Sequence, residues 1–270
     1  QGNAQRLLER LAGNAARPQD HGRVARQRED RGLDADGARS RPVTAEPAAL
    51  GRAAGGARSS GHGRRVVTGL EYTMPVIWAL VIGTAVALYI VLDGFDLGLG
   101  ILFPYFRSEQ DRDQMMNSVA PFWDGNETWL VLGGGGLWVA FPQAYAVIMP
   151  ALYLPVILML LALIFRGVAF EFRWIAKPRH RKWDIAFAAG STVAALSQGI
   201  ILGALIEGIT VVDGQFAGGA FDWLTPFALM CGLGVVAGYA LLGSTWLMMK
   251  TEGPVEVHAR RLAPALLGLL

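Results

Sequence analysis

Four long stretches of this chain carry no charged residue, and shorter polar segments separate them. They cover residues 73–92, 128–165, 185–206 and 223–249, with lengths of 20, 38, 22 and 27 residues. A membrane-spanning helix needs about 20 predominantly apolar residues. No stretch alternates apolar and polar residues with the period of two that marks transmembrane strands. The pattern therefore predicts an all-α, polytopic helical membrane protein.

The 38-residue stretch is too long for one span and fits parts of two. The segment FPQAY at 141–145 and Pro150 indicate a turn between them, because proline interrupts helices. Residues 262–270 resemble the start of a sixth span, so we expect the natural protein to continue beyond this chain. We expect five full transmembrane helices, near 74–104, 118–140, 150–172, 184–209 and 222–249.

The first 65 residues have a different composition from the rest. They carry 13 arginines and 7 acidic residues, a net charge of +6, and no Phe, Trp, Tyr or Ile, whereas residues 66–270 carry −4. So few large apolar residues cannot form a core, and the absence of an apolar run argues against a signal peptide. Without stacking aromatic residues, nucleic-acid binding is disfavoured. We expect a disordered Arg-rich segment at 1–65, added by a misassigned start, and a transmembrane domain at 66–270.

Lysine and arginine also predict the orientation of the helices. Basic residues follow the first, third and fifth expected helices, and the turns at 141–149 and 210–221 have none. Because cytoplasmic loops are enriched in Lys and Arg, the first helix is expected to start outside and end in the cytoplasm. The Arg-rich segment would then lie on the outer side, which again sets it apart from the membrane domain.

Acidic residues within the expected spans are the candidates for chemistry. Charge in a membrane is costly and usually functional. Asp93 and Asp96 lie late in the first span and Asp124 early in the second, so all three are expected in the cytoplasmic half. Carboxyls at similar depth on neighbouring helices can pass on protons, and we expect a proton pathway through them. Two structural alternatives remain: Asp124 caps its helix, or Asp96 is solvated at the interface. A network or capping role is expected for Trp123, Asn126 and Glu127.

Glycines within the spans are candidates for close helix packing. Gly94 and Gly98 are four residues apart, the spacing that lets two helix backbones approach each other. A run of four glycines lowers helix propensity by up to about 1 kcal/mol per residue. Tight contact with another helix or a bulky cofactor would offset this cost. The run comprises Gly133, Gly134, Gly135 and Gly136.

Histidines are absent from the expected spans, since the four in the chain are His21, His62, His180 and His258. A haem ligated by this chain is therefore not expected, and neither is a metal site, and the single Cys231 excludes an internal disulfide. The residues predict a helical membrane subunit with paired carboxyls and no redox ligand of its own. They leave open an accessory subunit of a larger complex and a stand-alone proton-coupled transporter.

Three segments carry a resemblance to a known family. They are DGFDLG at 93–98, MNSVAPFWDGNETWL at 116–130 and FRGVAFEFR at 165–173. Together they resemble subunit II of cytochrome bd-type quinol oxidases, and the ETW variant and the four glycines are most similar to the cyanide-insensitive branch. The likeness covers residues 70–270. Further helices follow the fifth in that family, so the resemblance also implies a C-terminal truncation.

The resemblance implies a function for the chain. Such oxidases oxidise quinol and reduce dioxygen to water, and their b-type and d-type haems belong to subunit I. This chain would be the non-haem subunit, with no catalytic residue of its own. It would support subunit I and conduct protons from the cytoplasm through Asp93 and Asp124, with a less defined part for Asp96. The expected setting is the bacterial cytoplasmic membrane. Further candidate partners are a small third subunit and a structural quinone.

Overall fold

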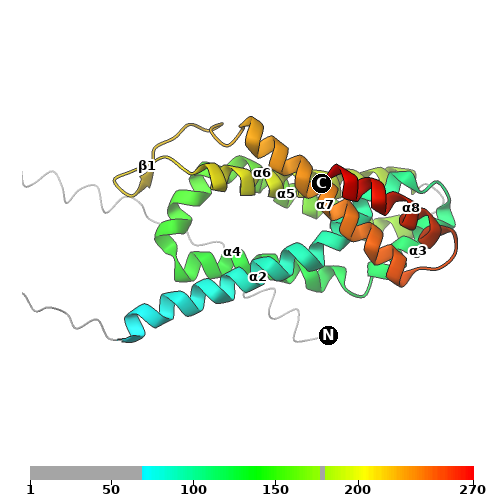
Figure 1. Ribbon diagram of the computed structural model, residues 1–270, viewed down its shortest axis with the longest axis horizontal. Coiled ribbons are helices and arrows are strands. Elements are labelled where there is room, and N and C mark those ends of the chain that lie inside the picture. Colours follow the sequence, from blue (N-terminus) through cyan, green and yellow to red (C-terminus); the bar gives the residue numbers. More distant parts are fainter. Residues whose placement is uncertain (1–68, 177–179) are drawn as a thin grey trace, which may run out of the picture. The chain divides into compact units, whose positions relative to one another are not determined.

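The computed structural model describes residues 69–176 and 180–270 (Figure 1). Four helices are long and apolar enough to cross a membrane. They are α2 (Gly69–Leu102), α5 (Pro142–Ile175), α6 (Arg181–Glu207) and α7 (Pro226–Lys250). The all-α polytopic class is thus confirmed. The predicted division at residue 65 lies outside the described residues.

Helix α4 (Trp123–Ala140) takes the place of the second predicted span. It has 18 residues and runs against α2 and α5, but its first turns are polar, and it is not among the four helices that reach the hydropathy of a membrane span. The number of spans therefore remains a prediction. Its boundary differs from the prediction of 118 because Pro121, which has no backbone N–H, falls in the turn before it.

Two short helices precede α4 where a loop was expected. The 3₁₀ helix η1 (Phe103–Tyr105) extends α2, and α3 (Glu109–Val119) follows it. Helix α3 is rich in charged residues, so its apolar content is low, but it buries Met115, Met116 and Val119 in the main core. Its charged positions interrupt the apolar ones, so this short amphipathic helix does not lie in an uncharged stretch of the sequence.

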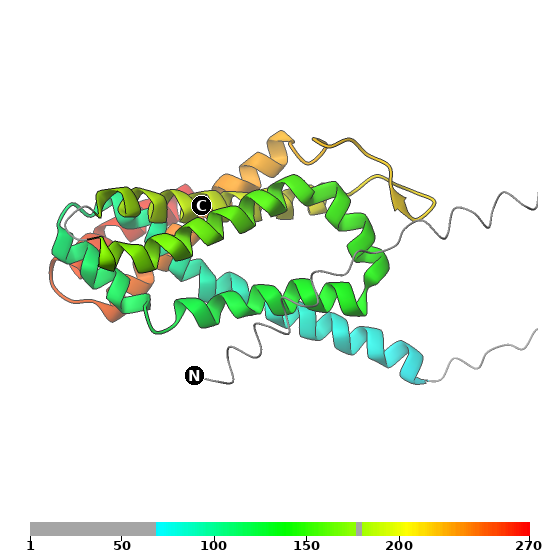
Figure 2. The same cartoon turned by 180° about the vertical axis from the view of Figure 1, so that it is seen from behind.

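Helix α5 begins at Pro142, so the predicted turn at 141–150 is largely helical. Proline is favourable in the first helical turn, where its missing N–H needs no partner. The chain instead changes direction at a kink, where Leu152 leaves helical geometry with φ −116° and ψ 16° between Pro150 and Pro155. Figure 2 shows the first part of α5 turning the chain between α4 and the long remainder of α5.

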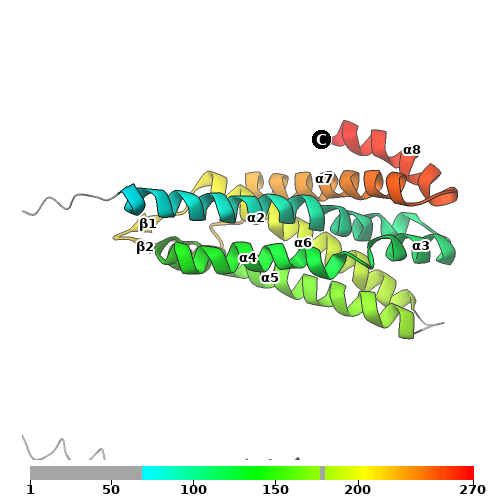
Figure 3. The ribbon, with the colours of Figure 1, turned by 90° about the horizontal axis from the view of Figure 1, so that it is seen from below.

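The C-terminal end of the chain forms α8 (Pro254–Leu269), which begins before the predicted position 262. It packs against α7 (Figure 3) and buries Val255 and Ala259 there. Between α6 and α7 lies a small hairpin of β1 (Val211–Val212) and β2 (Gln215–Phe216). Its turn uses Asp213 and Gly214, both with positive φ, as tight two-residue hairpins require.

Glycines hold the long helices close together. Gly98 of α2 lies against Gly243 of α7, and a side chain on either residue would overlap the backbone of the other helix. Gly199 and Gly203 of α6 meet α7 in the same way. Helix α2 contacts α4, α6 and α7, and its Asp93 and Asp96 face the interior of the bundle.

Candidate functional site

A buried ionic cluster lies where α2, α4 and α5 meet, and we call it the Arg166 cluster. It comprises Asp93, Asp96, Asn126, Glu127 and Arg166. The guanidinium of Arg166 is its centre, with a side chain that is 1% exposed. Charges are this deeply buried only when partners offset the loss of hydration.

Two carboxylates face Arg166 from different helices. Nη1 of Arg166 donates to Oε1 of Glu127 at 2.6 Å, while its Nη2 lies 3.9 Å from Oδ1 of Asp93. The aromatic rings of Trp123 and Phe187 lie 6.0 Å from the guanidinium carbon and add cation–π attraction. Glu127 keeps a partly exposed side chain, so the cluster reaches from the interior to the surface of the described chain.

Asp96 belongs to the same cluster through α4. Nδ2 of Asn126 donates to Oδ2 of Asp96 at 2.7 Å and also lies 3.3 Å from the carbonyl oxygen of Leu92. Asp96 is fully buried, so in the described chain it is not solvated at an interface. Trp123 thus contacts Arg166 by its ring, and Asn126 contacts Asp96 by its amide.

Asp93 differs from the other carboxylates because neither of its oxygens makes a hydrogen bond of ordinary geometry, although Arg166 and the hydroxyl of Tyr89 both interact with it. Both oxygens are buried without a hydrogen-bond partner among the described residues, as is Oδ1 of Asp96. Nε and Nη2 of Arg166 are buried without an acceptor as well. Three carboxyls share one guanidinium, and an excess of negative charge in the bundle interior is costly. The arrangement can therefore hold a proton or polar molecules between these groups.

Asp124 does not join the Arg166 cluster. It is exposed in the first turn of α4, one turn before Glu127, and its side chain makes no capping hydrogen bond. A negative charge in this turn is favourable because the N-terminal end of a helix carries partial positive charge. The structure thus brings Asp93 and Asp96 together, and it leaves Asp124 exposed at the surface of the protein near them.

The glycines of α4 divide between two faces. Gly133 and Gly136 are buried, where a side chain would meet Val86 and Ile82 of α2. Gly134 and Gly135 have open space above them. On α2, a side chain at Gly94 would collide with the ring of Tyr239. Packing against α2 thus accounts for Gly133 and Gly136, whereas Gly134 and Gly135 lie on an exposed face of α4.

A chain of three polar side chains next to Asp93 was missed by the sequence analysis. The hydroxyl of Tyr239 donates to Oε1 of Gln198 at 2.7 Å, and Nε2 of Gln198 donates to the hydroxyl of Tyr89, also at 2.7 Å. Tyr89 lies one helical turn before Asp93 on α2. The signal available in the sequence is that these uncharged polar residues lie within apolar stretches.

A second ionic cluster, the Arg173 cluster, lies two turns further along α5. Nε of Arg173 donates to Asp184 at 2.6 Å and its Nη1 pairs with Asp113. Nη1 of Arg112 donates to the other oxygen of Asp184 at 2.8 Å, and its Nε to the carbonyl oxygen of Phe106 at 2.7 Å. This network connects α3, α5 and α6.

The histidines, cysteine and acidic residues of the described part of the chain do not gather into a metal site. In residues 69–176 and 180–270 no group of three His, Cys, Asp or Glu side chains could hold a metal ion. Of the two histidines described, His180 precedes α6 beside Glu109 and the ring of His258 lies 4.9 Å from that of Phe106. Neither lies in one of the four long helices.

The fold and the Arg166 cluster define a multi-pass membrane protein with a charged centre inside its helices. A family model described as cytochrome bd terminal oxidase subunit II matches residues 74–270. The chain therefore belongs to the cytochrome bd oxidase subunit II family, and the predicted resemblance is confirmed. The narrower likeness to the cyanide-insensitive branch stays a prediction.

Three curated relatives illustrate the match. Cytochrome bd-I ubiquinol oxidase subunit 2 of Escherichia coli K12 is 39% identical over 197 residues, covering 70% of this chain and 52% of that protein. A probable cytochrome oxidase subunit 2 of Haemophilus influenzae is 36% identical, with the same shares. Cytochrome bd ubiquinol oxidase subunit 2 of Bacillus subtilis is 30% identical and covers 72% and 59%. The chain thus spans about half the length of the curated relatives it matches.

Proposed function

We propose that this chain acts as the non-haem subunit II of a bd-type terminal oxidase, which oxidises quinol and reduces dioxygen to water. The family membership and the names of the relatives support this proposal. In it, the haem-bearing subunit I supplies the b-type and d-type haems and thereby the electron transfer. The residues of this chain support that subunit and conduct protons from the cytoplasm, with the first span starting on the outer side.

The Arg166 cluster is the observation that carries the proton role. Dioxygen reduction consumes protons, and a bundle of apolar helices blocks them unless polar groups provide a route. Asp93 is completely buried, neither of its oxygens makes a hydrogen bond of ordinary geometry to a described residue, and it interacts with Arg166 and the hydroxyl of Tyr89. Such a carboxyl can accept a proton and release it, because burial disfavours its charge while the guanidinium 3.9 Å away favours it.

The placement of the carboxyls suggests an order for the route. Asp124 is exposed, so it would exchange protons with water, and Glu127 follows one turn further on α4. Glu127 and Asp93 both face Arg166, so the route would pass from Glu127 to Asp93 in the interior of the bundle. Asp96, held by Asn126, would stand beside this route. The open face at Gly134 and Gly135 supports close packing of α4 against the haem-bearing partner.

The variant Asp93→Asn tests the proton role directly. It keeps the size of the side chain and removes the titratable group, so oxygen consumption by the full-length subunit in its oxidase should fall about 100-fold, within the range for a lost proton-transfer group. The measurement is quinol-driven oxygen uptake by the purified oxidase in liposomes, with the haem spectrum recorded on the same sample.

Asp213→Asn is the matched control, because Asp213 lies in the exposed hairpin turn and asparagine tolerates its positive φ. The control should consume oxygen at the normal rate. Normal turnover in Asp93→Asn would contradict the proton role, and so would loss of haem d, since that result would mean a structural defect.

A stand-alone proton-coupled transporter makes a different prediction about partners. The full-length subunit should co-purify with a haem-bearing membrane protein and show no haem spectrum by itself. A subunit that purifies alone and moves protons with a solute in liposomes would overturn the oxidase assignment.

A further inference from the structure

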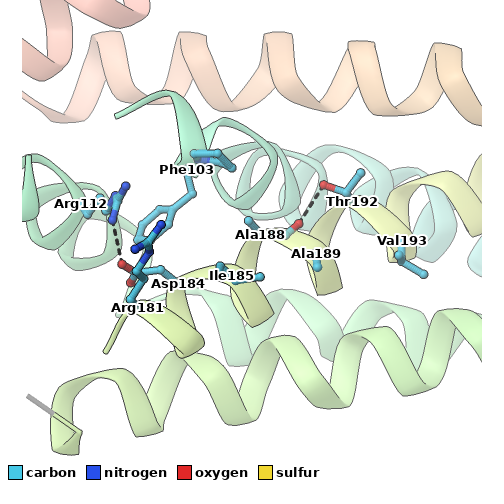
Figure 4. A pocket seen from close by; sticks show the side chains of 10 residues that line it. Phe103, Arg112, Arg181, Asp184, Ile185, Ala188, Ala189, Thr192 and Val193 are labelled. Carbon is cyan, nitrogen blue, oxygen red and sulfur yellow. Dashed lines mark hydrogen bonds and ion pairs between the residues drawn. The ribbon is translucent and has the colours of Figure 1, made fainter. Parts of the chain in front are cut away.

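A partly open cavity of about 600 Å³ runs along the N-terminal half of α6 (Figure 4). It lies apart from the Arg166 cluster, because none of the five residues of that cluster lines it. Its lining includes Phe103 and Pro104, and Figure 4 shows Phe103, Arg112, Asp184 and Arg181 near one end. Figure 4 shows the guanidinium groups of Arg112 and Arg181 gathered around Asp184 at this end, with α6 continuing away from them.

The wall of the cavity is apolar and made of small side chains. Ala188, Ala189, Thr192 and Val193 follow one another along one side of α6. The hydroxyl of Thr192 donates to the carbonyl oxygen of Ala188 at 2.8 Å, so it presents its methyl group rather than an unpaired polar group. Such a wall suits a hydrocarbon chain that lies parallel to the helix.

The rim of the cavity carries positive charge. Asp184 bonds two arginines, Arg112 through one oxygen and Arg173 through the other, so its single negative charge is already shared between two cations before Arg181 is counted. Arg181 is exposed and has no ion-pair partner among residues 69–176 and 180–270. Arg112 retains Nη2, because its hydrogen bonds use Nε and Nη1. The rim thus offers two guanidinium groups to an anion.

We propose that this cavity binds an anionic phospholipid, with the phosphate at Arg181 and Arg112 and one acyl chain along α6. The charged rim lies at the end of a membrane-spanning helix and the apolar wall runs along its length, so the two parts match the head group and the acyl chain of a lipid. The Lys and Arg distribution of the chain places this end at the cytoplasmic leaflet, where anionic lipids are found. The site is independent of the proton route.

The experiment uses the full-length subunit in its oxidase, embedded in phosphatidylcholine nanodiscs with a trace of phosphatidylglycerol that carries a photoreactive acyl chain. Cross-linking should label α6 near Ala189, and phosphatidylcholine with the same chain should label it less. Arg181→Gln should reduce labelling by phosphatidylglycerol about fivefold, as expected for one basic residue at an anionic surface. Ala189→Trp should abolish it by filling the cavity.

Two matched controls separate this site from general attraction to the membrane. Lys182→Gln removes a neighbouring exposed cation that does not line the cavity, and Leu205→Trp adds the same bulk on α6 outside it. Both variants should be labelled by phosphatidylglycerol as strongly as the unchanged subunit. Equal effects of Arg181→Gln and Lys182→Gln would overturn the proposal, as would displacement by inorganic phosphate alone. Absence of labelling would overturn it too, because another protein segment would then fill the cavity.

Discussion

Arg166 and Arg173 lie seven residues apart on one face of α5, and both are fully buried, yet their surroundings differ. The Arg173 cluster joins two arginines to two aspartates, and both oxygens of Asp184 are satisfied. The Arg166 cluster sets three carboxyls against one guanidinium, and neither oxygen of Asp93 makes a hydrogen bond of ordinary geometry to a described residue. Balanced charge joins helices, whereas unbalanced charge leaves room for a mobile proton.

The Arg173 cluster should give the largest effect when it is broken. Arg173→Leu removes the buried cation that bonds one oxygen of Asp184 and pairs with Asp113, and breaking a buried pair typically costs about 3–5 kcal/mol. We expect the full-length subunit to lose assembly, measured as the yield of folded oxidase and its thermal stability.

A triple variant serves as the control for this prediction. Arg173→Leu combined with Asp113→Leu and Asp184→Leu removes the buried cation together with both aspartates and leaves only the partly exposed Arg112, so it should recover part of the lost stability if unpaired buried charge is the cause. A stable oxidase with Arg173→Leu alone would show that this cluster does not hold α3, α5 and α6 together.

The Arg166 cluster should affect turnover more than folding. Glu127→Gln keeps a hydrogen-bond acceptor for Arg166 but removes the charge between Asp124 and Asp93. Glu127 is partly exposed, so the loss of stability should be small, at about 1 kcal/mol. We expect oxygen consumption to fall about tenfold, less than for Asp93→Asn, because water can bypass a partly exposed group.

Glu171→Gln is the matched control, since Glu171 is an exposed acid of α5 outside both clusters. It should leave oxygen consumption unchanged. If Glu127→Gln also turns over normally while Asp93→Asn does not, protons reach Asp93 by a route that avoids α4.

The contrast between the clusters also shows what could be predicted from the sequence. The place of Asp93 and Asp96 in the first span followed from the sequence, the burial of Asp96 was left open, and four predicted spans correspond to α2, α5, α6 and α7. The partner of Asp93 did not follow. Arg166 lies 73 positions after Asp93 in the chain, and a single sequence does not reveal which helices are neighbours.

Asp124 shows a second limit. Its depth in the membrane was expected to match that of Asp93, but depth does not determine the face of a helix. Asp124 and Asn126 are two residues apart, which rotates one side chain from the other by about 200°. Asn126 therefore points to Asp96 while Asp124 is exposed. Only the packing of α4 against α2 decides which of them enters the cluster.

The smallest effect is expected at the outer edge of the Arg173 cluster. Arg112 is partly exposed, with 23% of its side chain accessible, and Asp184 keeps its bond to Arg173 when Arg112 is replaced. Arg112→Gln should therefore lower the free energy of unfolding by about 1 kcal/mol or less. Thermal denaturation of the oxidase in low and high salt measures it, because a partly exposed pair is screened by salt. A loss as large as that of Arg173→Leu would mean that Asp184 depends equally on both arginines, and that the cluster acts as one unit rather than as a buried pair with an exposed addition.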